Sequence, residues 1–229
     1  MNLIDRGSKK TIFFSIMNRK PFLRLILTVL ILCFLSACDR PQKSGIDFDQ
    51  IDTSRDPIQR SFRSNESILI ETKAGQFTLT PVAEYQLAGV VVSKEPYSFD
   101  WNAEISPVDL AIAWGKLTEP ENAKYVSFSQ RNRWYFYEYK PESPLDHSYI
   151  LSHSSNNHII PATENIFLAL KTVSRKEKVM LEGFLVNLKG TYKGGTVYWN
   201  TSLTRKDSGD GSCELFYVTK ARVGSDVYE

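Results

Sequence analysis

An uncharged apolar block at residues 25–34 divides the chain and decides which part of it can fold as a globular domain. The small residues Ser36 and Ala37 follow the block, and basic residues precede it: Lys9, Lys10, Arg19, Lys20 and Arg24. This order is typical of a bacterial export signal. The block is shorter than the roughly 20 apolar residues that a membrane-spanning helix needs. We therefore expect residues 1–37 to be a cleavable leader, with Met1 or Met17 as its start.

The end of the leader carries a short motif, Leu35-Ser36-Ala37-Cys38. It resembles the lipobox of bacterial lipoproteins, in which the Cys thiol is acylated and the leader is cut off just before it. The resemblance implies that Cys38 is the first residue of the mature chain and binds the membrane through its lipid. Asp39 resembles the signal that retains lipoproteins in the inner membrane, but Arg40 is not the residue that usually strengthens it. The sequence therefore does not decide between the inner and the outer membrane as the site of attachment.

The charge of the mature chain argues against a nucleic-acid partner. Without the six basic residues and one acidic residue of the leader, the chain's 28 basic and 26 acidic residues become 22 and 25, a net charge of about −3. Nucleic-acid binders usually carry a clustered basic face, and no dense Lys/Arg run follows Cys38. Cys213 is then left without a partner for an internal disulfide, and it is predicted to be a small buried apolar residue.

Composition divides the mature chain into a tether, a domain and a tail. Residues 38–65 are polar and rich in turn residues, which predicts a flexible, lipid-anchored tether. Residues 66–222 have the length of one domain, and residues 223–229 are predicted to be a C-terminal tail.

Strand patterns dominate residues 66–222. Residues 67–71 and 77–80 flank Gly75 and predict a hairpin, and residues 85–92 predict a buried strand in which Gly89 marks a bend or a close backbone approach. Further strands are predicted at 125–128, 133–139, 178–186, 197–203 and 214–218, the last three as an antiparallel meander.

Two short helices are expected among the strands. Ser106 and Pro107 predict a helix start and Gly115 its end. A second helix is predicted after Pro161, because Ile166, Phe167, Leu170 and Val173 recur on one helical face. Strands and helices without a βαβ rhythm predict an α+β fold, with a mostly antiparallel curved sheet or a small β-barrel-like core.

The strand at 133–139 is unusually aromatic. Tyr135, Tyr137 and Tyr139 fall on one face, and Trp134 and Phe136 fall on the other. Two interpretations stay open. The strand is sandwiched in the core, or Trp134, Tyr135, Tyr137 and Tyr139 form an aromatic platform for a ligand.

All three histidines, His147, His153 and His158, lie in one short polar segment. Imidazoles are common zinc ligands, but this spacing matches no helical or finger motif, so a structural loop is the main interpretation. The turn-rich stretch 204–214 adds Asp207, Asp210 and Glu214. If the two segments were adjacent, these carboxylates would be candidate metal ligands or a general base.

Several motifs between residues 85 and 218 resemble an uncharacterised family of exported and lipid-anchored proteins of Gram-negative bacteria, with no assigned activity. They are SPVDL at 106–110, WG at 114–115, RWYF at 133–136, SHSSNNHIIP at 152–161, GFLV at 183–186 and SLTRKDSGDGSCE at 202–214. The resemblance implies no mechanism and no catalytic residue.

The sequence thus predicts a lipid-anchored, periplasm-facing protein of the cell envelope that works as a binding or envelope-assembly module, with an envelope protein or component as its partner. No cofactor is predicted. The alternative is a hydrolase dependent on zinc or manganese that uses His153 and His158 with Asp207, Asp210 or Glu214.

Overall fold

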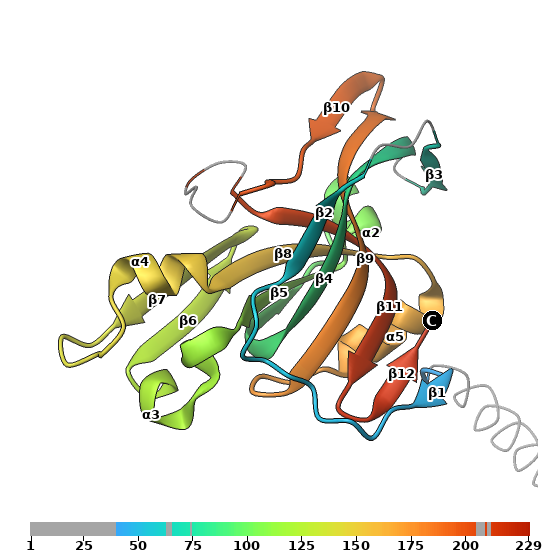
Figure 1. Ribbon diagram of the computed structural model, residues 1–229. Helices are drawn as coiled ribbons and strands as arrows, with labels where there is room; N and C mark the ends of the chain where they lie inside the picture. Colours follow the sequence, from blue (N-terminus) through green and yellow to red (C-terminus); the bar gives the residue numbers. More distant parts are fainter. Residues whose placement is uncertain (1–39, 63–65, 74, 205–208, 210–211) are drawn as a thin grey trace, which may run out of the picture. The chain divides into compact units, whose positions relative to one another are not determined.

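The computed structural model describes residues 40–229 except 63–65, 74, 205–208 and 210–211. Half of these residues lie in strands (Figure 1). The strands are β1 (Gly45–Ile46), β2 (Ile58–Ser61), β3 (Ile68–Glu71), β4 (Gln76–Pro96), β5 (Val108–Ala113), β6 (Val126–Arg131), β7 (Trp134–Tyr139), β8 (Ser154–Pro161), β9 (Lys178–Tyr192), β10 (Gly195–Trp199), β11 (Glu214–Val223) and β12 (Asp226–Tyr228).

The helices of the described residues are short. They are α2 (Trp101–Ile105), α3 (Pro120–Ala123), α4 (His147–Ser152) and α5 (Glu164–Thr172), with one 3₁₀ turn, η1 (Gly115–Thr118). Within these described ranges, none has the length and apolar character needed to cross a membrane.

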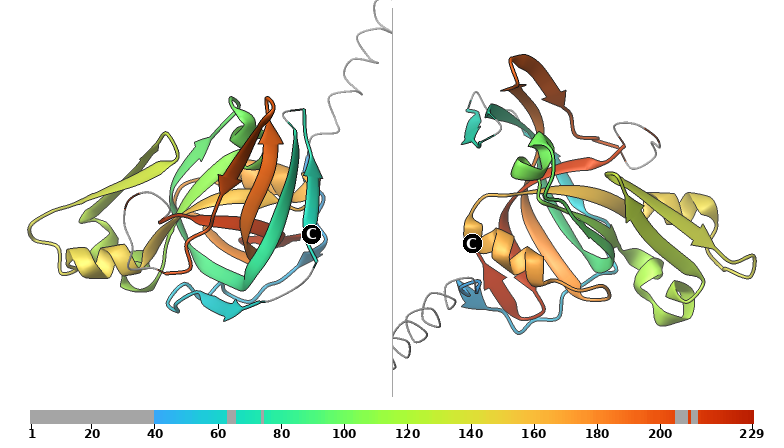
Figure 2. Two further views of the ribbon diagram at one scale, coloured as in Figure 1. Left: turned by 90° about the horizontal axis from the view of Figure 1, so that it is seen from above. Right: turned by 180° about the vertical axis from the view of Figure 1, so that it is seen from behind.

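Five strands pair in a closed circuit, in the order β4, β5, β8, β11, β9 and back to β4. Every pairing in the circuit is antiparallel except that of β8 with β11, which is parallel. A closed circuit leaves no free sheet edge among its members. The result is the curved, barrel-like core of an α+β fold, as predicted (Figure 2).

The main hydrophobic core fills this circuit. Leu87 of β4, Ile112 of β5 and Phe216 of β11 are fully buried in it. Helix α5 packs against the same cluster through Ile166 and Leu170. The predicted second helix is therefore confirmed as α5, where the Thr163 side chain accepts a hydrogen bond from the Ile166 amide as its N-cap.

The predicted first helix is wrong, because residues 108–113 form β5. All six residues of β5 are buried between β4 and β8, and a central strand covered on both faces tolerates a continuous apolar run. Pro107 does not open a helix. It follows α2, whose C-cap is Ser106, as expected where proline restricts the preceding residue.

The hairpin predicted around Gly75 is confirmed, whereas the predicted meander is wrong in part. β3 pairs with β4, β6 pairs with β7, and β9 pairs with β10, each antiparallel. β11 does not continue from β10, because it pairs with β8 and β9. Gly89 does lie at a close approach, since a Cβ there would come within 2.4 Å of Ile112 Cγ2.

The domain extends beyond the predicted boundaries at both ends. β1 pairs with β12, β2 pairs with β4 at residues 83–86, and Ile51 is only 5% exposed, so the described part of the predicted tether is packed on the domain. The predicted tail is likewise wrong. β12 pairs with β11, and Tyr228 is buried. The leader and Cys38 lie outside the described residues.

Candidate functional site

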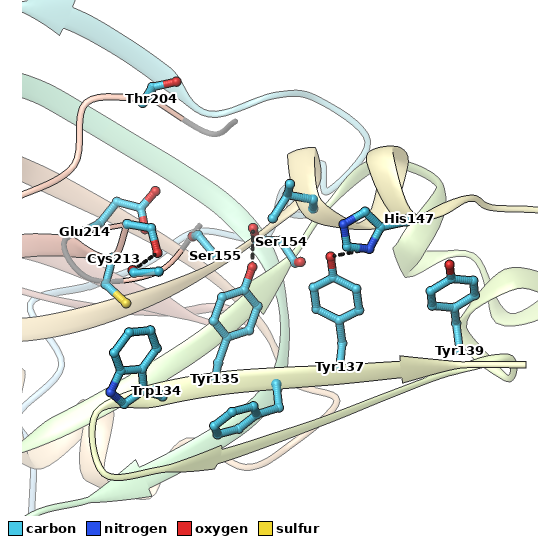
Figure 3. Close-up of a pocket in the computed structure, with 14 residues that line it drawn as sticks. Trp134, Tyr135, Tyr137, Tyr139, His147, Ser154, Ser155, Thr204, Cys213 and Glu214 are labelled. Carbon is cyan, nitrogen blue, oxygen red and sulfur yellow. Dashed lines mark hydrogen bonds between the residues drawn. The ribbon is translucent and has the colours of Figure 1, made fainter. Parts of the chain in front are cut away.

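A cleft of about 370 Å³ lies between the β6–β7 hairpin and the main sheet (Figure 3). We call it the aromatic cleft. One wall is β7, and the opposite side is formed by α4, the start of β8 and the start of β11. The lining residues are Trp134, Tyr135, Phe136, Tyr137, Tyr139, His147, Leu151, Ser154, Ser155, Thr204, Gly209, Ser212, Cys213 and Glu214. Its volume is within the usual range for small-molecule sites.

The strand alternation of β7 sets the aromatic wall. Figure 3 shows Tyr135, Tyr137 and Tyr139 in a row that points toward β8 and α4. The Tyr135 hydroxyl donates to the Ser154 carbonyl at 3.4 Å, and the Tyr137 hydroxyl lies 3.1 Å from Nδ1 of His147. These contacts fix two of the rings from the opposite side of the cleft. The shared face predicted for the three tyrosines is therefore present.

The wall is only partly covered. Trp134 is 38% exposed, Phe136 45% and Tyr139 43%, while Tyr135 and Tyr137 also pack on the small cluster around Phe128 and Ile150. The strand is thus neither sandwiched in the main core nor free in solvent. It offers exposed aromatic surface on a strand that is supported from one side.

Burial raises the pKa of the Tyr135 phenol, and to a lesser degree it raises the pKa of Tyr137. The folded state therefore keeps Tyr135 neutral at a pH where the unfolded chain, with a tyrosine pKa near 10, loses the proton. The stability that this contributes is present below pH 10 and is lost as the pH rises through the higher pKa of the folded state.

We expect the wild type to lose about 1.4 kcal/mol more stability than Tyr135→Phe between pH 8 and pH 11, since the unfolded phenol ionises over that range. Urea unfolding of both proteins at the two pH values measures the difference, and the other tyrosines cancel in the comparison. Equal losses in the two proteins would show that Tyr135 ionises freely in the folded state.

An ion pair fixes the turn of the β6–β7 hairpin to the main sheet. Arg133 Nη1 lies 2.7 Å from Oδ1 of Asp109, a fully buried carboxylate on β5. The second carboxylate oxygen, Oδ2, lies 2.9 Å from Nδ1 of His158 on β8. The Arg133 guanidinium also stacks on Tyr97 at 3.6 Å, and the Arg133 amide donates to the Tyr97 hydroxyl. We call Asp109, Arg133 and His158 the hairpin clamp.

Asn156 of β8 adds a second attachment. Its side-chain oxygen accepts from Gln130 Nε2 at 2.6 Å, and its nitrogen donates to the Arg133 carbonyl at 3.0 Å. Asn156 is 1% exposed. Loss of one of these hydrogen bonds would leave a buried polar group without a partner, which lowers the free energy of unfolding. Asn156 therefore ties β6 and the hairpin turn to the same strand of the main sheet.

Arg133 occupies a turn position whose backbone conformation favours glycine. Arg131 pairs with Trp134, and the two residues between them, Asn132 and Arg133, have φ of 55° and 70°. This is a two-residue turn in which both central residues need positive φ, and glycine is favoured at the second of them. An arginine there costs about 1 kcal/mol or more of backbone strain.

The three histidines lie in different surroundings. His147 begins α4 and lines the aromatic cleft. His153 follows α4, stacks on Tyr149 at 3.7 Å, and places Nε2 3.8 Å from Asp56 Oδ1. His158 belongs to the hairpin clamp and packs near Trp199. The clustering of His in the sequence is thus not a clustering in space.

Only part of the predicted metal set is described. Glu214 is 4% exposed at the start of β11 and lines the cleft, while Asp207 and Asp210 lie outside the described residues. His153 and His158 contact different carboxylates. Across residues 40–229 with the stated gaps, no three His, Cys, Asp or Glu side chains converge on a point suited to a metal ion.

A second hollow, of about 460 Å³, adjoins the aromatic cleft. It contains Arg133, His158 and Trp199, and it shares Trp134 and Cys213 with the cleft. Asn156 Nδ2 donates to Cys213 Sγ at 3.5 Å. Cys213 lines both hollows and is half-buried, so the prediction of a buried residue is wrong. Trp134, Gly209 and Cys213 line both hollows.

Sequence reasoning missed the hairpin clamp and Asn156. Their signals were present but ambiguous: a single Asp in the apolar run 108–113, and an Arg at a turn position that favours Gly. Comparison with known proteins adds no candidate, because no family model, curated protein or solved structure matches the chain. The family resemblance noted above stays a prediction.

Proposed function

We propose that this is a lipid-anchored binding protein of the Gram-negative cell envelope that faces the periplasm and holds an envelope glycan in the aromatic cleft. The observation that carries the proposal is the group of partly exposed aromatic rings on β7, Trp134, Phe136 and Tyr139, which line the same cleft as several polar side chains. The envelope address depends on the leader and on the lipobox that ends at Cys38.

The chemistry of the lining favours a sugar. A pyranose ring has C–H groups on its faces and hydroxyls around its edge. Trp134 and Tyr139 offer flat apolar surface to such a face, while Ser155, Glu214 and His147 offer acceptors and donors to the hydroxyls. Apolar walls with a few placed polar groups are the usual composition of a small-molecule site.

Chitotetraose, a soluble chain of N-acetylglucosamine, is a suitable probe because envelope glycan strands contain N-acetylated amino sugars. We expect it to bind the domain and Trp134→Ala to weaken the affinity roughly 30-fold, the effect of removing a contact worth about 2 kcal/mol. Isothermal titration calorimetry measures both dissociation constants.

Phe99→Ala is the matched control, because Phe99 is an 84% exposed aromatic residue outside the cleft. It should leave the affinity within about twofold of the wild type. Absence of binding by the wild type, or equal affinity in Trp134→Ala, would remove the glycan proposal.

A further inference from the structure

The chain is attached to the domain very soon after Cys38. The Gln42 amide donates to Asn165 Oδ1 at 2.6 Å, and Asn165 Nδ2 donates back to the Gln42 carbonyl at 2.9 Å. Lys43 pairs with Asp226 at 2.9 Å, and the Ser44 amide donates to the Val227 carbonyl at 2.8 Å. From Gln42 onward the chain is therefore held against α5 and β12.

The length of the link follows from backbone geometry. Four residue steps separate Cys38 from Gln42, and an extended chain spans at most about 3.6 Å per residue, so the link reaches no more than about 14 Å. The tether predicted over 38–65 would have reached several times farther. A lipid on Cys38 would hold the surface around Gln42 and β1 within reach of the bilayer headgroups.

That surface exposes two large apolar side chains. Phe48 is 88% exposed and Ile46 is 58% exposed, in and just after β1. Between them Asp47 turns inward and pairs with Arg222, whose guanidinium also bonds the Asp49 carbonyl. Because Arg222 is only 5% exposed, these contacts hold residues 47–49 against the domain from its buried side. The exposed fractions of Ile46 and Phe48 place both side chains on the outside of the domain.

We propose that this face, formed by Ile46, Phe48 and the β1–β12 edge, is seated on the lipid bilayer, with the Phe48 ring at the boundary between headgroups and acyl chains. The proposal depends on lipidation of Cys38, which is part of the proposed function. Aromatic and aliphatic side chains favour this boundary zone. The lipid attaches the protein to the bilayer, and Ile46 and Phe48 fix the orientation of the domain relative to it. The domain therefore contacts the membrane surface and does not move freely at the end of a tether.

The test places an environment-sensitive fluorophore at position 48 of the full-length protein, purified in vesicles of phosphatidylethanolamine and phosphatidylglycerol. Phe48→Cys in a Cys213→Ala background gives one reactive thiol once Cys38 is acylated. Phe99→Cys is the control with a similar exposed fraction, because Phe99 lies two residues before α2 in the chain, and α2 lies away from β1 (Figure 1). We expect a blue-shifted emission at position 48 and at least threefold stronger quenching by nitroxide lipids than at position 99.

Mass spectrometry of residue 38 in the same samples separates the two proposals. An acylated protein whose probe at position 48 is as water-exposed as the probe at position 99 overturns the seated face and leaves the anchor intact. A protein with no acyl group at Cys38 overturns the anchor and the seated face together.

Discussion

Replacement of Arg133 by alanine is expected to lower the free energy of unfolding by about 3–5 kcal/mol, the effect of breaking a buried ion pair from one side. Asp109 is fully buried, so its carboxylate would lose the charge that compensates it. For a domain of this size the change corresponds to a fall in Tm of about 6–20 °C. Urea unfolding followed by circular dichroism measures the loss.

Arg131→Ala is the matched control on the same hairpin, because Arg131 is exposed and stands two residues away. It should change stability by less than about 0.5 kcal/mol. A loss in Arg133→Ala no larger than this would mean that the hairpin clamp contributes little to holding the hairpin.

Two further variants separate the effect of losing the ion pair from the effect of backbone strain at position 133. Arg133→Gly removes the same ion pair but suits the positive φ, so it should be about 1 kcal/mol less destabilised than Arg133→Ala. The double variant Asp109→Ala with Arg133→Ala should lose less than the sum of the two single losses, since neither charge is then left alone. Additive losses would argue against direct coupling of the two side chains.

The clamp shows why part of the site could not be predicted from the sequence. The alternation on β7 is local, and it correctly placed Tyr135, Tyr137 and Tyr139 on one face. What those rings would face depends on pairings between distant segments. Asp109 and Arg133 are 24 residues apart, and His158 joins them only because β8 pairs with β5. The spacing of these residues in the sequence does not predict that they come together in the fold.

The error at β5 has a related cause. A proline after a serine is a common helix start, and this local signal competes with burial, which is a property of the whole fold. Once β4 and β8 cover both edges of the 108–113 segment, its apolar residues are more stable in a strand. By contrast α5, whose cap and apolar face are both local, was predictable.

The polar composition of residues 40–62 predicted a flexible tether, but these residues are packed on the domain. Few apolar residues occur there, but the backbone finds partners: the Gly115 amide donates to the Thr53 carbonyl at 2.8 Å, and Phe62 donates to Val82 at 3.1 Å. Trp114 Nε1 donates to Asp56 Oδ1 at 2.9 Å. Ile51, Thr53 and Pro57 are the buried residues of the segment, and backbone and side-chain hydrogen bonds hold the rest of it on the domain.

A chain that begins at Glu66 should therefore be severely destabilised relative to one that begins at Arg40. It lacks β1, β2 and Ile51, and loss of the Ile51 contacts alone is worth about 2–5 kcal/mol. The edge of β4 at residues 83–86 also loses its β2 partner, and the Trp114 indole loses Asp56. We expect a total loss of roughly 4 kcal/mol or more, seen as a lower urea midpoint and stronger binding of an apolar dye.

Two point substitutions within the longer chain distinguish packing from mere length. Ile51→Ala removes a side chain that is 5% exposed, whereas Ile58→Ala removes one of the same type, 49% exposed, from the same segment. The first should account for a large share of the truncation effect, and the second should cost less than about 1 kcal/mol. If the chain from Glu66 unfolds at the same urea concentration as the chain from Arg40, residues 40–62 contribute nothing to the fold. The short link from Cys38 to the domain, and the seated face inferred from it, would then lose their structural basis.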